Sequence, residues 1–245
     1  MFAHGFGCDQ NMWRLVAPRF EDRFRVVTFD FVGAGRSDAS AYDEDRYASL
    51  DGYAADVVEL LDELALGPVV FVGHSVSSMI GVLASIARPE LFDRLVLVGP
   101  SARYIDDGDY VGGFSASDID ELLESMSSNY LGWSHAITPA IMGNDDRPEL
   151  SAELDESFCR ADPTIARQFA EVTFRSDNRA DLPDVTVPTL VLQCRDDVIA
   201  PLTAGEHVRD HVPDAKYVLL DATGHCPHLS APGATAAAID EFVVA

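Results

Sequence analysis

The residues most informative about the fold are PVVFVGHSVS, at positions 68–77. Positions 68–73 are a continuous apolar run, which is the pattern of a strand buried on both faces of a parallel sheet. Residues 76–87 are apolar and rich in small side chains, and Pro89 follows them, so we predict a helix that packs on this sheet and ends before the proline. Ser75 therefore stands at a sharp turn between a buried strand and a helix.

The same alternation of β-branched runs and helical patterns continues on both sides of this stretch. Strands are predicted at 25–29, 95–98, 189–194 and 217–220, and helices at 54–64, near 202–211 and around 231–243. Strands that alternate with helices in this way build a mostly parallel sheet covered by helices on both faces. We therefore predict an α/β protein.

One long segment breaks this alternation. Between Pro100 and about residue 181 no β-rich run occurs, and helical periodicity takes over. One amphipathic helix is predicted to have Ser117 as its N-cap and to carry a stripe formed by Ile119, Leu122, Leu123, Met126 and Tyr130. A second stripe is formed by Ile165, Phe169 and Val172. Apolar stripes need a surface to cover, so we predict that residues 101–181 form a helical lid on a core made of residues 1–100 and 182–245.

Composition and charge limit the kind of protein. Of the 245 residues, 47% are hydrophobic and 9% aromatic, which is enough to bury a core and argues against disorder. The formal net charge of −24 would repel a phosphate backbone, so no nucleic-acid partner is expected. No apolar stretch approaches the ~18 residues of a membrane-spanning helix, so no membrane partner is expected either. The four cysteines lack a C-x-x-C spacing and the N-terminus lacks a secretory signal, which predicts free thiols and a cytoplasmic location.

Gly73-His74-Ser75-Val76-Ser77 is the strongest candidate for chemistry. A serine hydroxyl is a weak nucleophile unless a sharp turn exposes it to a base, and small flanking residues permit that turn. The pattern is a nucleophile elbow in which Ser77 stands in place of the second glycine. The alternative is a plain strand-to-helix turn capped by Ser75. The buried strand before it and the apolar helix after it favour the nucleophile.

A base and an orienting acid are expected after later strands, in the chain order Ser, Asp, His. His225 follows the strand 217–220 and is the candidate base, because a neutral imidazole can take the serine proton near pH 7. Asp196 and Asp197 both follow the strand 189–194, and spacing alone does not choose between them. A carboxylate at either position would hold the imidazole in the required tautomer.

Metal and cofactor signals are weak. His225 and His228 flank Cys226, but no third ligand group lies nearby in the sequence, so no metal site is expected. GAGRSD at 33–38 resembles the start of a dinucleotide fingerprint, yet the third glycine is missing and no helix is predicted to begin there. We therefore expect an enzyme that uses no cofactor.

Two backbone N–H groups are needed to bind the negative oxygen of a tetrahedral intermediate. The N–H of Val76, directly after the candidate nucleophile, provides one. The turn HGFG at residues 4–7, called the oxyanion turn below, has glycines that allow close approach to a substrate, so the N–H of Phe6 is the candidate for the second. The alternative is a simple loop without a binding role.

With these motifs, the chain resembles the α/β-hydrolase superfamily over nearly its whole length. Within it, the chain is most similar to the RsbQ-type bacterial stress-signalling hydrolases, which are themselves similar to the plant strigolactone and karrikin receptor hydrolases. The stretches that carry the resemblance are HGFGCDQ (4–10), GHSVSSMIG (73–81), RPELF (88–92), GGF (112–114) and GHCPHLS (224–230). In that family the acid lies in a segment of the form acid-x-x-x-Pro, so the resemblance selects Asp197, which precedes Pro201 by four positions.

The resemblance also implies a V-shaped lid of four helices, inserted after the sixth strand of the family's order. The lid would cover a deep apolar pocket with the serine at its floor. The residues that the resemblance implies for the pocket lining are Phe6, Phe114, Tyr130, Trp133, Ile137 and Phe174. Such a lining suits a small, largely apolar ester or lactone. The alternative for each lid aromatic is a place in the core of the lid.

The N-terminus departs from the family pattern, in which two strands precede the oxyanion turn. Here only Met1, Phe2 and Ala3 precede it. Either the N-terminal edge hairpin is missing, or the native start codon lies upstream. We favour the upstream start, because three residues are not expected to form the strand that positions Phe6. The intact mass of the protein from its native source tests this expectation, since a mass of 26.6 kDa would contradict it.

These observations predict a carboxylic-ester hydrolase with a serine nucleophile. Ser75 would attack a carbonyl, His225 would carry the proton, Asp197 would orient His225, and water would clear the acyl-enzyme. A second hypothesis is a ligand-sensing signalling protein, in which slow hydrolysis sets the state of the lid and a partner such as a stress-pathway phosphatase reads it. A third is a cofactor-free perhydrolase or haloperoxidase-like activity on the same triad.

Overall fold

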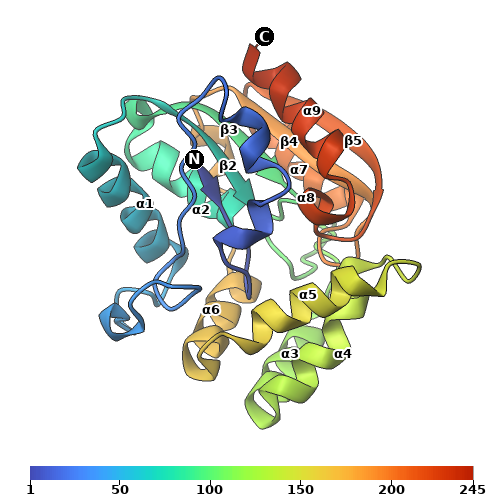
Figure 1. Cartoon of the computed structure of the whole chain (residues 1–245). Helices are drawn as coiled ribbons and strands as arrows, with labels where there is room; N and C mark the ends of the chain where they lie inside the picture. Colours follow the sequence, from blue (N-terminus) through green and yellow to red (C-terminus); the bar gives the residue numbers. More distant parts are fainter. Residues whose placement is uncertain (245) are drawn as a thin grey trace.

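A parallel β-sheet forms the centre of the molecule. The computed structural model describes residues 1–244. The strands of the sheet are β1 (Phe2–Ala3), β2 (Val69–His74), β3 (Phe92–Val98), β4 (Thr189–Asp196) and β5 (Ala215–Thr223), in the spatial order β1-β2-β3-β4-β5. Neighbouring strands are parallel throughout, with Val72 opposite Val96 and Val96 opposite Leu190. The loops after all five strands therefore begin at one edge of the sheet (Figure 1).

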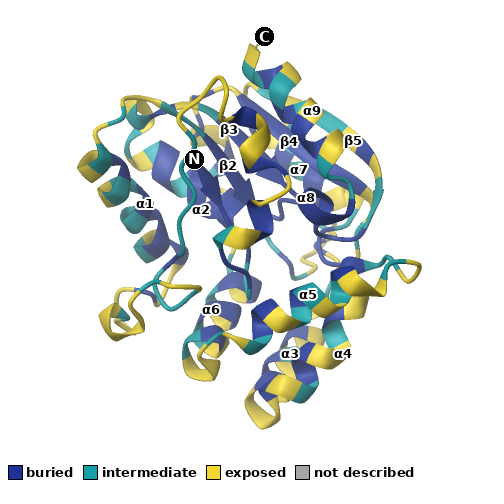
Figure 2. Ribbon diagram, in the orientation of Figure 1, coloured by how far each residue is buried: buried dark blue, intermediate teal, exposed yellow. Residues whose placement is uncertain are grey.

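Each face of the sheet has its own helical cover. The helices outside the predicted lid are α1 (Leu50–Leu64), α2 (Val76–Ala87), α7 (Leu202–His211), α8 (Pro227–Ser230) and α9 (Pro232–Val244). Phe71 and Leu95 lie in a buried cluster with α1, α2 and α7, whereas the next residues, Val72 and Val96, cluster with α9. Figure 2 shows buried strands between helices whose outer surfaces are exposed. This arrangement confirms the predicted α/β fold.

Shorter elements complete the core. The 3-10 helices lie at Gln10–Trp13, Ala17–Phe20, Ala39–Ala41, Pro89–Leu91 and Leu182–Asp184. The cysteines Cys8, Cys159, Cys194 and Cys226 are all free. Within residues 1–244, no helix combines the length and the apolar character that crossing a membrane requires.

Four helices lie between β3 and β4, inside the predicted lid region. They are α3 (Ala116–Ser128), α4 (Tyr130–Met142), α5 (Pro148–Cys159) and α6 (Pro163–Arg175), called the four-helix insert below. Each contributes to one buried cluster, through Ile119, Trp133, Leu154 and Phe174 respectively. Phe6 of the oxyanion turn packs against the same cluster. The insert therefore lies against the loops at one end of the sheet, as Figure 1 shows.

The helix predicted from Ser117 to Tyr130 is two helices in the structure. The N-cap of α3 is Ser115, whose hydroxyl accepts the N–H of Asp118 while the Asp118 carboxylate accepts the N–H of Ser115. Asn129 ends α3 in a non-helical conformation, and its side chain caps the first turn of α4. The prediction of one helix was wrong because the apolar stripe continues across a residue that stops one helix and starts the next.

The N-terminal strands differ from the prediction in two ways. Phe2–Ala3 pairs in parallel with β2, so the expectation that three residues before His4 cannot form a strand is wrong. The segment 25–29, predicted as a strand, forms only a single bridge, from Thr28 to Phe2. A short β1 explains this difference, because it offers few residues for a further strand to pair with.

Candidate active site

Ser75 occupies a strained turn between β2 and α2. Its backbone has φ 56° and ψ −123°, a conformation that side-chain-bearing residues rarely adopt. The turn requires a small residue at Gly73, because a Cβ there would lie 2.4 Å from the carbonyl oxygen of Ser77. The Ser75 side chain makes no capping hydrogen bond to α2. The hydroxyl is therefore available for another partner, and the alternative of a plain capped turn does not describe it.

That partner is His225. Nε2 of His225 lies 2.7 Å from Oγ of Ser75, and Nδ1 of His225 lies 2.8 Å from Oδ2 of Asp197. The carboxylate accepts the proton on Nδ1, which leaves Nε2 as the acceptor of the Ser75 O–H. The side chains of His225 and Asp197 are only 5% and 1% exposed. Three residues from three different loops thus form one continuous chain of hydrogen bonds.

The structure brings Asp197, and not Asp196, to the imidazole. Oδ1 of Asp197 accepts the backbone N–H groups of Ile199 and Ala200, at 2.9 and 3.0 Å, which orients the other carboxylate oxygen toward His225. Asp196 is exposed at the end of β4. The register of the strand end therefore selects between the two aspartates that spacing left open.

The backbone of His225 is held from two sides. Its N–H donates to the carbonyl of Ile141 at the end of α4, at 2.8 Å, and its carbonyl accepts from Nε2 of His74, at 2.9 Å. Gly224 has φ 89° and packs on α4, since a Cβ there would lie 1.9 Å from the carbonyl oxygen of Met142. The position of the imidazole thus depends on α4 as well as on the loop after β5.

The proposed oxyanion donors lie on two segments in direct contact. Val76 begins α2, so its N–H has no partner within that helix. The oxyanion turn lies against the elbow, because the Ser77 hydroxyl donates to the carbonyl of His4. Among the described residues, neither the Phe6 N–H nor the Val76 N–H donates to a protein acceptor.

The predicted pocket residues gather in one apolar cluster. Phe6, Phe114, Tyr130, Trp133, Ile137 and Phe174 all belong to the core shared by the insert and the oxyanion turn. The ring of Phe6 lies 6.1 Å from that of Phe174 and 6.3 Å from that of Trp133, measured between centroids. The Tyr130 hydroxyl donates to the carbonyl of Phe158 at 3.0 Å. An apolar environment thus covers the side of the oxyanion turn that faces the insert.

Tyr104 is a site residue that sequence reasoning missed. Its hydroxyl lies 3.4 Å from Oγ of Ser75, and its ring lies 5.1 Å from that of Phe174. Burial raises the pKa of the Tyr104 phenol, so the group is protonated and can donate at neutral pH. No motif quoted from the sequence marks Tyr104, and its link to the GGF stretch, in which the N–H of Phe114 donates to the carbonyl of Tyr104 at 3.2 Å, exists only in the folded chain.

Gly99, directly after β3, is a second missed residue. It has φ 59°, and a Cβ there would lie 3.2 Å from Cε1 of His225 and 3.5 Å from Oδ2 of Asp197. Only a residue without a side chain lets the chain pass so closely behind this pair in a left-handed conformation. Gly99 therefore positions the His225–Asp197 pair by leaving room for it.

A group of buried histidines lies beside His225. Ligand atoms of His74, Cys226 and His228 fall within 4.8 Å of one another, so the expectation that no third ligand group lies near His228 is corrected. Burial lowers the pKa of both His74 and His228, the latter to about 3, and both rings are therefore neutral at pH 7. Because one nitrogen of His74 already binds the backbone of His225, we interpret this group as support for the imidazole.

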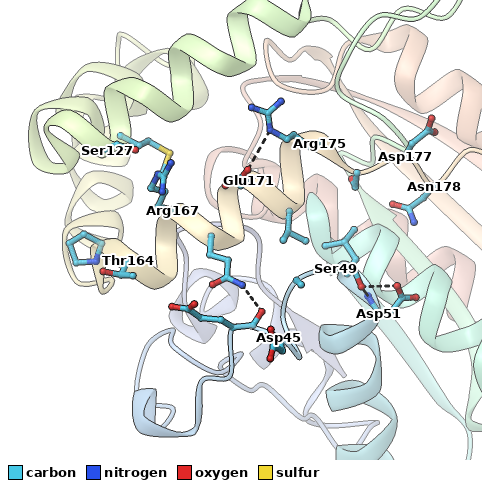
Figure 3. Close-up of a pocket in the computed structure, with 18 of the residues that line it drawn as sticks. Asp45, Ser49, Asp51, Ser127, Thr164, Arg167, Glu171, Arg175, Asp177 and Asn178 are labelled. Carbon is cyan, nitrogen blue, oxygen red and sulfur yellow. Dashed lines mark hydrogen bonds and ion pairs between the residues drawn. The ribbon is translucent and has the colours of Figure 1, made fainter.

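A separate groove lies away from the hydroxyl of Ser75. It has a volume of about 1250 Å³ and is lined by the segment 44–51, by α3 and by α6 (Figure 3). Its labelled side chains are mostly charged or polar, including Asp45, Arg167 and Glu171. None of the residues that line it belongs to the hydrogen-bond chain of Ser75. Its lining also includes apolar side chains and Tyr130, one of the predicted pocket residues.

Comparison with known proteins places the chain in a family. The sequence matches the alpha/beta hydrolase family over residues 1–238, and the chain belongs to this family. It is 41% identical over 233 residues to the karrikin insensitive 2 receptor CA of Petunia hybrida, which covers 95% of this chain and 86% of the petunia protein. It is also 41% identical over 231 residues to strigolactone esterase D14 of Arabidopsis thaliana, which covers 94% of this chain and 86% of that protein.

A solved structure is similarly close. A hydrolase from Oleispira antarctica is 40% identical and superimposes with a TM-score of 0.96, covering 99% of this chain and 89% of that chain. The family match and these relatives confirm the predicted resemblance to the α/β-hydrolase superfamily and to its strigolactone and karrikin receptor members. They also support the predicted enzyme class, a carboxylic-ester hydrolase.

Proposed function

We propose that the chain is a serine hydrolase that cleaves a small hydrophobic ester or lactone. The observation that carries this proposal is the chain of hydrogen bonds from Ser75 Oγ through His225 to Asp197, with separations of 2.7 and 2.8 Å. Such an arrangement makes an alcohol reactive in neutral water, because the imidazole takes the proton as the oxygen attacks. The esterase named among the relatives agrees with this chemistry.

In the first step, Oγ of Ser75 bonds to the substrate carbonyl carbon and its proton passes to Nε2 of His225. Asp197 stabilises the imidazolium that forms. The N–H groups of Phe6 and Val76 bind the oxygen that becomes negative. When the carbon–oxygen bond to the leaving group breaks, His225 returns the proton to that oxygen. In the second step His225 takes a proton from water as the water oxygen attacks the acyl carbon. The bond from that carbon to Oγ of Ser75 then breaks, and His225 returns the proton to Oγ, which releases the acid and restores Ser75.

The apolar cluster supports a hydrophobic substrate. Phe6, Phe114, Tyr130, Trp133, Ile137 and Phe174 would supply the walls of the binding site. In this proposal, residues 101–181 act as the lid, with the four-helix insert over Ser75. The site uses backbone N–H groups and side chains for every step, so the mechanism requires no cofactor.

A second candidate function is ligand sensing. The karrikin receptor and the strigolactone esterase among the relatives favour it, since one protein carries the name of a receptor and the other that of an enzyme. In this hypothesis the chain is an RsbQ-like signalling protein, and slow hydrolysis in the cytoplasm would set the position of the insert. A stress-pathway phosphatase would then bind one of its states.

Replacing the nucleophile tests the hydrolase proposal. Ser75→Ala is expected to reduce turnover of p-nitrophenyl acetate to the background rate, whereas Ser85→Ala, further along α2, is expected to retain it. Turnover by Ser75→Ala at the wild-type rate would reject the proposal. The rate on the native substrate separates the two functions, because many turnovers per second indicate metabolism and a few per hour indicate sensing.

A further inference from the structure

A cluster of three different metal-binding side chains joins two helices of the insert, outside the site described above. His135 lies on α4, and Asp155 and Cys159 lie on α5. One ligand atom from each residue falls within 4.8 Å of the other two. Nδ1 of His135 lies 2.5 Å from Oδ2 of Asp155, and Sγ of Cys159 lies 3.8 Å from Oδ1 of the same carboxylate.

The helices present these groups on facing surfaces. Asp155 and Cys159 are four residues apart, so both project from one side of α5. His135 reaches them from α4, which packs along α5. The His135 side chain is 63% exposed and that of Asp155 is 19% exposed. A hydrated ion can therefore reach the cluster from solvent, in contrast to the buried group around His228.

We propose that His135, Asp155 and Cys159 bind one Zn²⁺ ion, with a water molecule as the fourth ligand. Imidazole, carboxylate and thiolate are the ligand types that Zn²⁺ takes in proteins, and a thiolate disfavours Ca²⁺ and Mg²⁺. On binding, the Cys159 thiol gives its proton to the buffer and a Zn–S bond forms. The proposal does not depend on the hydrolase assignment, because none of these residues belongs to the triad.

The distances suit a tetrahedral ion after a small movement. Zinc bond lengths place a carboxylate oxygen and a sulfur ~3.6 Å apart, and a nitrogen and an oxygen ~3.4 Å apart. The oxygen and sulfur of Asp155 and Cys159 already lie 3.8 Å apart. Nδ1 of His135 lies 2.5 Å from the other oxygen, Oδ2, so the ring must turn away from Oδ2 to share an ion bound to Oδ1, which its exposed position allows.

A hydrogen bond is ready to orient the carboxylate. The Ser134 hydroxyl donates to Oδ1 of Asp155 and also lies 3.8 Å from Sγ of Cys159. Partners of this kind hold metal ligands in the orientation that binding needs. An ion at the site would link α4 to α5 and so stabilise the folded insert.

Zinc binding by the full-length protein tests the proposal. With ZnCl₂ in a buffer that contains a non-chelating reductant, calorimetry is expected to show one ion per chain and release of a proton. His135→Ala and Cys159→Ser are each expected to weaken binding by ~10-fold or more, since a lost ligand costs at least as much as a lost supporting partner. Circular dichroism and unfolding of the metal-free variants check that they fold.

A matched control comes from α7. His207 and His211 are also four residues apart, with ring centroids 3.9 Å apart, and are the alternative pair of zinc ligands to exclude. His211→Ala is expected to leave zinc binding unchanged. With Co²⁺ in place of Zn²⁺, wild type is expected to show a sulfur-to-metal charge-transfer band that Cys159→Ser lacks. Loss of binding in His211→Ala but not in Cys159→Ser, or no 1:1 binding in the wild type, would overturn the proposal.

Discussion

The hydroxyl of Ser77 donates a hydrogen bond to the carbonyl oxygen of His4 across 73 positions of sequence. Both residues are buried. The bond ties the first turn of α2 to the oxyanion turn, and these two segments carry the proposed oxyanion donors, Val76 and Phe6. The distance between the two donors therefore depends on the hydrogen bond of Ser77, a residue that takes no part in the chemistry.

Ser77→Ala is expected to lower kcat/KM for p-nitrophenyl acetate by ~10-fold, because it frees the oxyanion turn to move. It also leaves the buried carbonyl of His4 unpaired, which is expected to reduce the free energy of unfolding by about 1–3 kcal/mol. Ser85→Ala is the matched control, since its hydroxyl donates to Val82 within the same helix. Steady-state kinetics and urea unfolding measure both effects. Equal kcat/KM in the two variants would contradict the coupling.

The pair Asp196 and Asp197 allows a direct test of the acid. Asp197→Asn is expected to reduce kcat by on the order of 10³–10⁴-fold, because an amide donates to Nδ1 and favours the wrong tautomer of His225. Asp196→Asn removes the same charge from the adjacent residue and is expected to change kcat little. Kinetics of the two variants under identical conditions decide the assignment. A large loss in Asp196→Asn alone would reverse it.

Gly99 is expected to be intolerant of a methyl group. Gly99→Ala places a Cβ 3.2 Å from the His225 ring, and the displaced imidazole is expected to lower kcat by ~10-fold or more. Gly108→Ala is the control, because Gly108 has a similar φ of 61° with no atom within 4 Å of the added Cβ. Both variants are expected to lose about 1–2 kcal/mol of stability from backbone strain. Similar kcat values for the two would show that the contact with His225 is unimportant.

The buried histidines predict a loss of stability in acid. Burial, with a smaller contribution from His225, lowers the pKa of His228 from 6.5 to about 3. Between these values the unfolded chain binds a proton that the folded chain does not. The free energy of unfolding is therefore highest above pH 6.5 and falls as the pH falls. At pH 5 the loss from His228 is about 2 kcal/mol, at 1.36 kcal/mol per pH unit.

Urea unfolding at several pH values between 5 and 7.5 measures this dependence. His228→Phe keeps an aromatic ring beside Trp13 and removes the titrating group. The free energy of unfolding of this variant is expected to fall less steeply with decreasing pH than that of the wild type. The difference between the two slopes is expected to reach up to one bound proton, which is about 1.36 kcal/mol per pH unit. His211→Ala, at an exposed position, is expected to keep the wild-type slope. A wild-type slope in His228→Phe would assign the acid sensitivity to other groups.

Much of the fold could be predicted because its signals are local. The helix predicted at 76–87 has the bounds of α2, and the run 68–73 corresponds to β2. The stripe from Ile119 to Tyr130 misled the helix prediction, since periodicity continued across the cap at Asn129. Periodicity reports which side chains share an apolar surface, and it does not report where a polar side chain ends one helix.

The sequence by itself was sufficient to identify Ser75 at an elbow and His225 after a late strand, because each lies in a short stretch whose neighbours specify its turn. Spacing alone left Asp196 and Asp197 open, and the family resemblance selected Asp197. The contact of Asp197 with the imidazole depends on how the chain leaves β4, which only the tertiary structure shows. The approach of Tyr104 to the serine, and of His135 to the side chains on α5, likewise depends on how separate helices and loops pack. Contacts of this kind join residues far apart in the chain, and no local pattern encodes them.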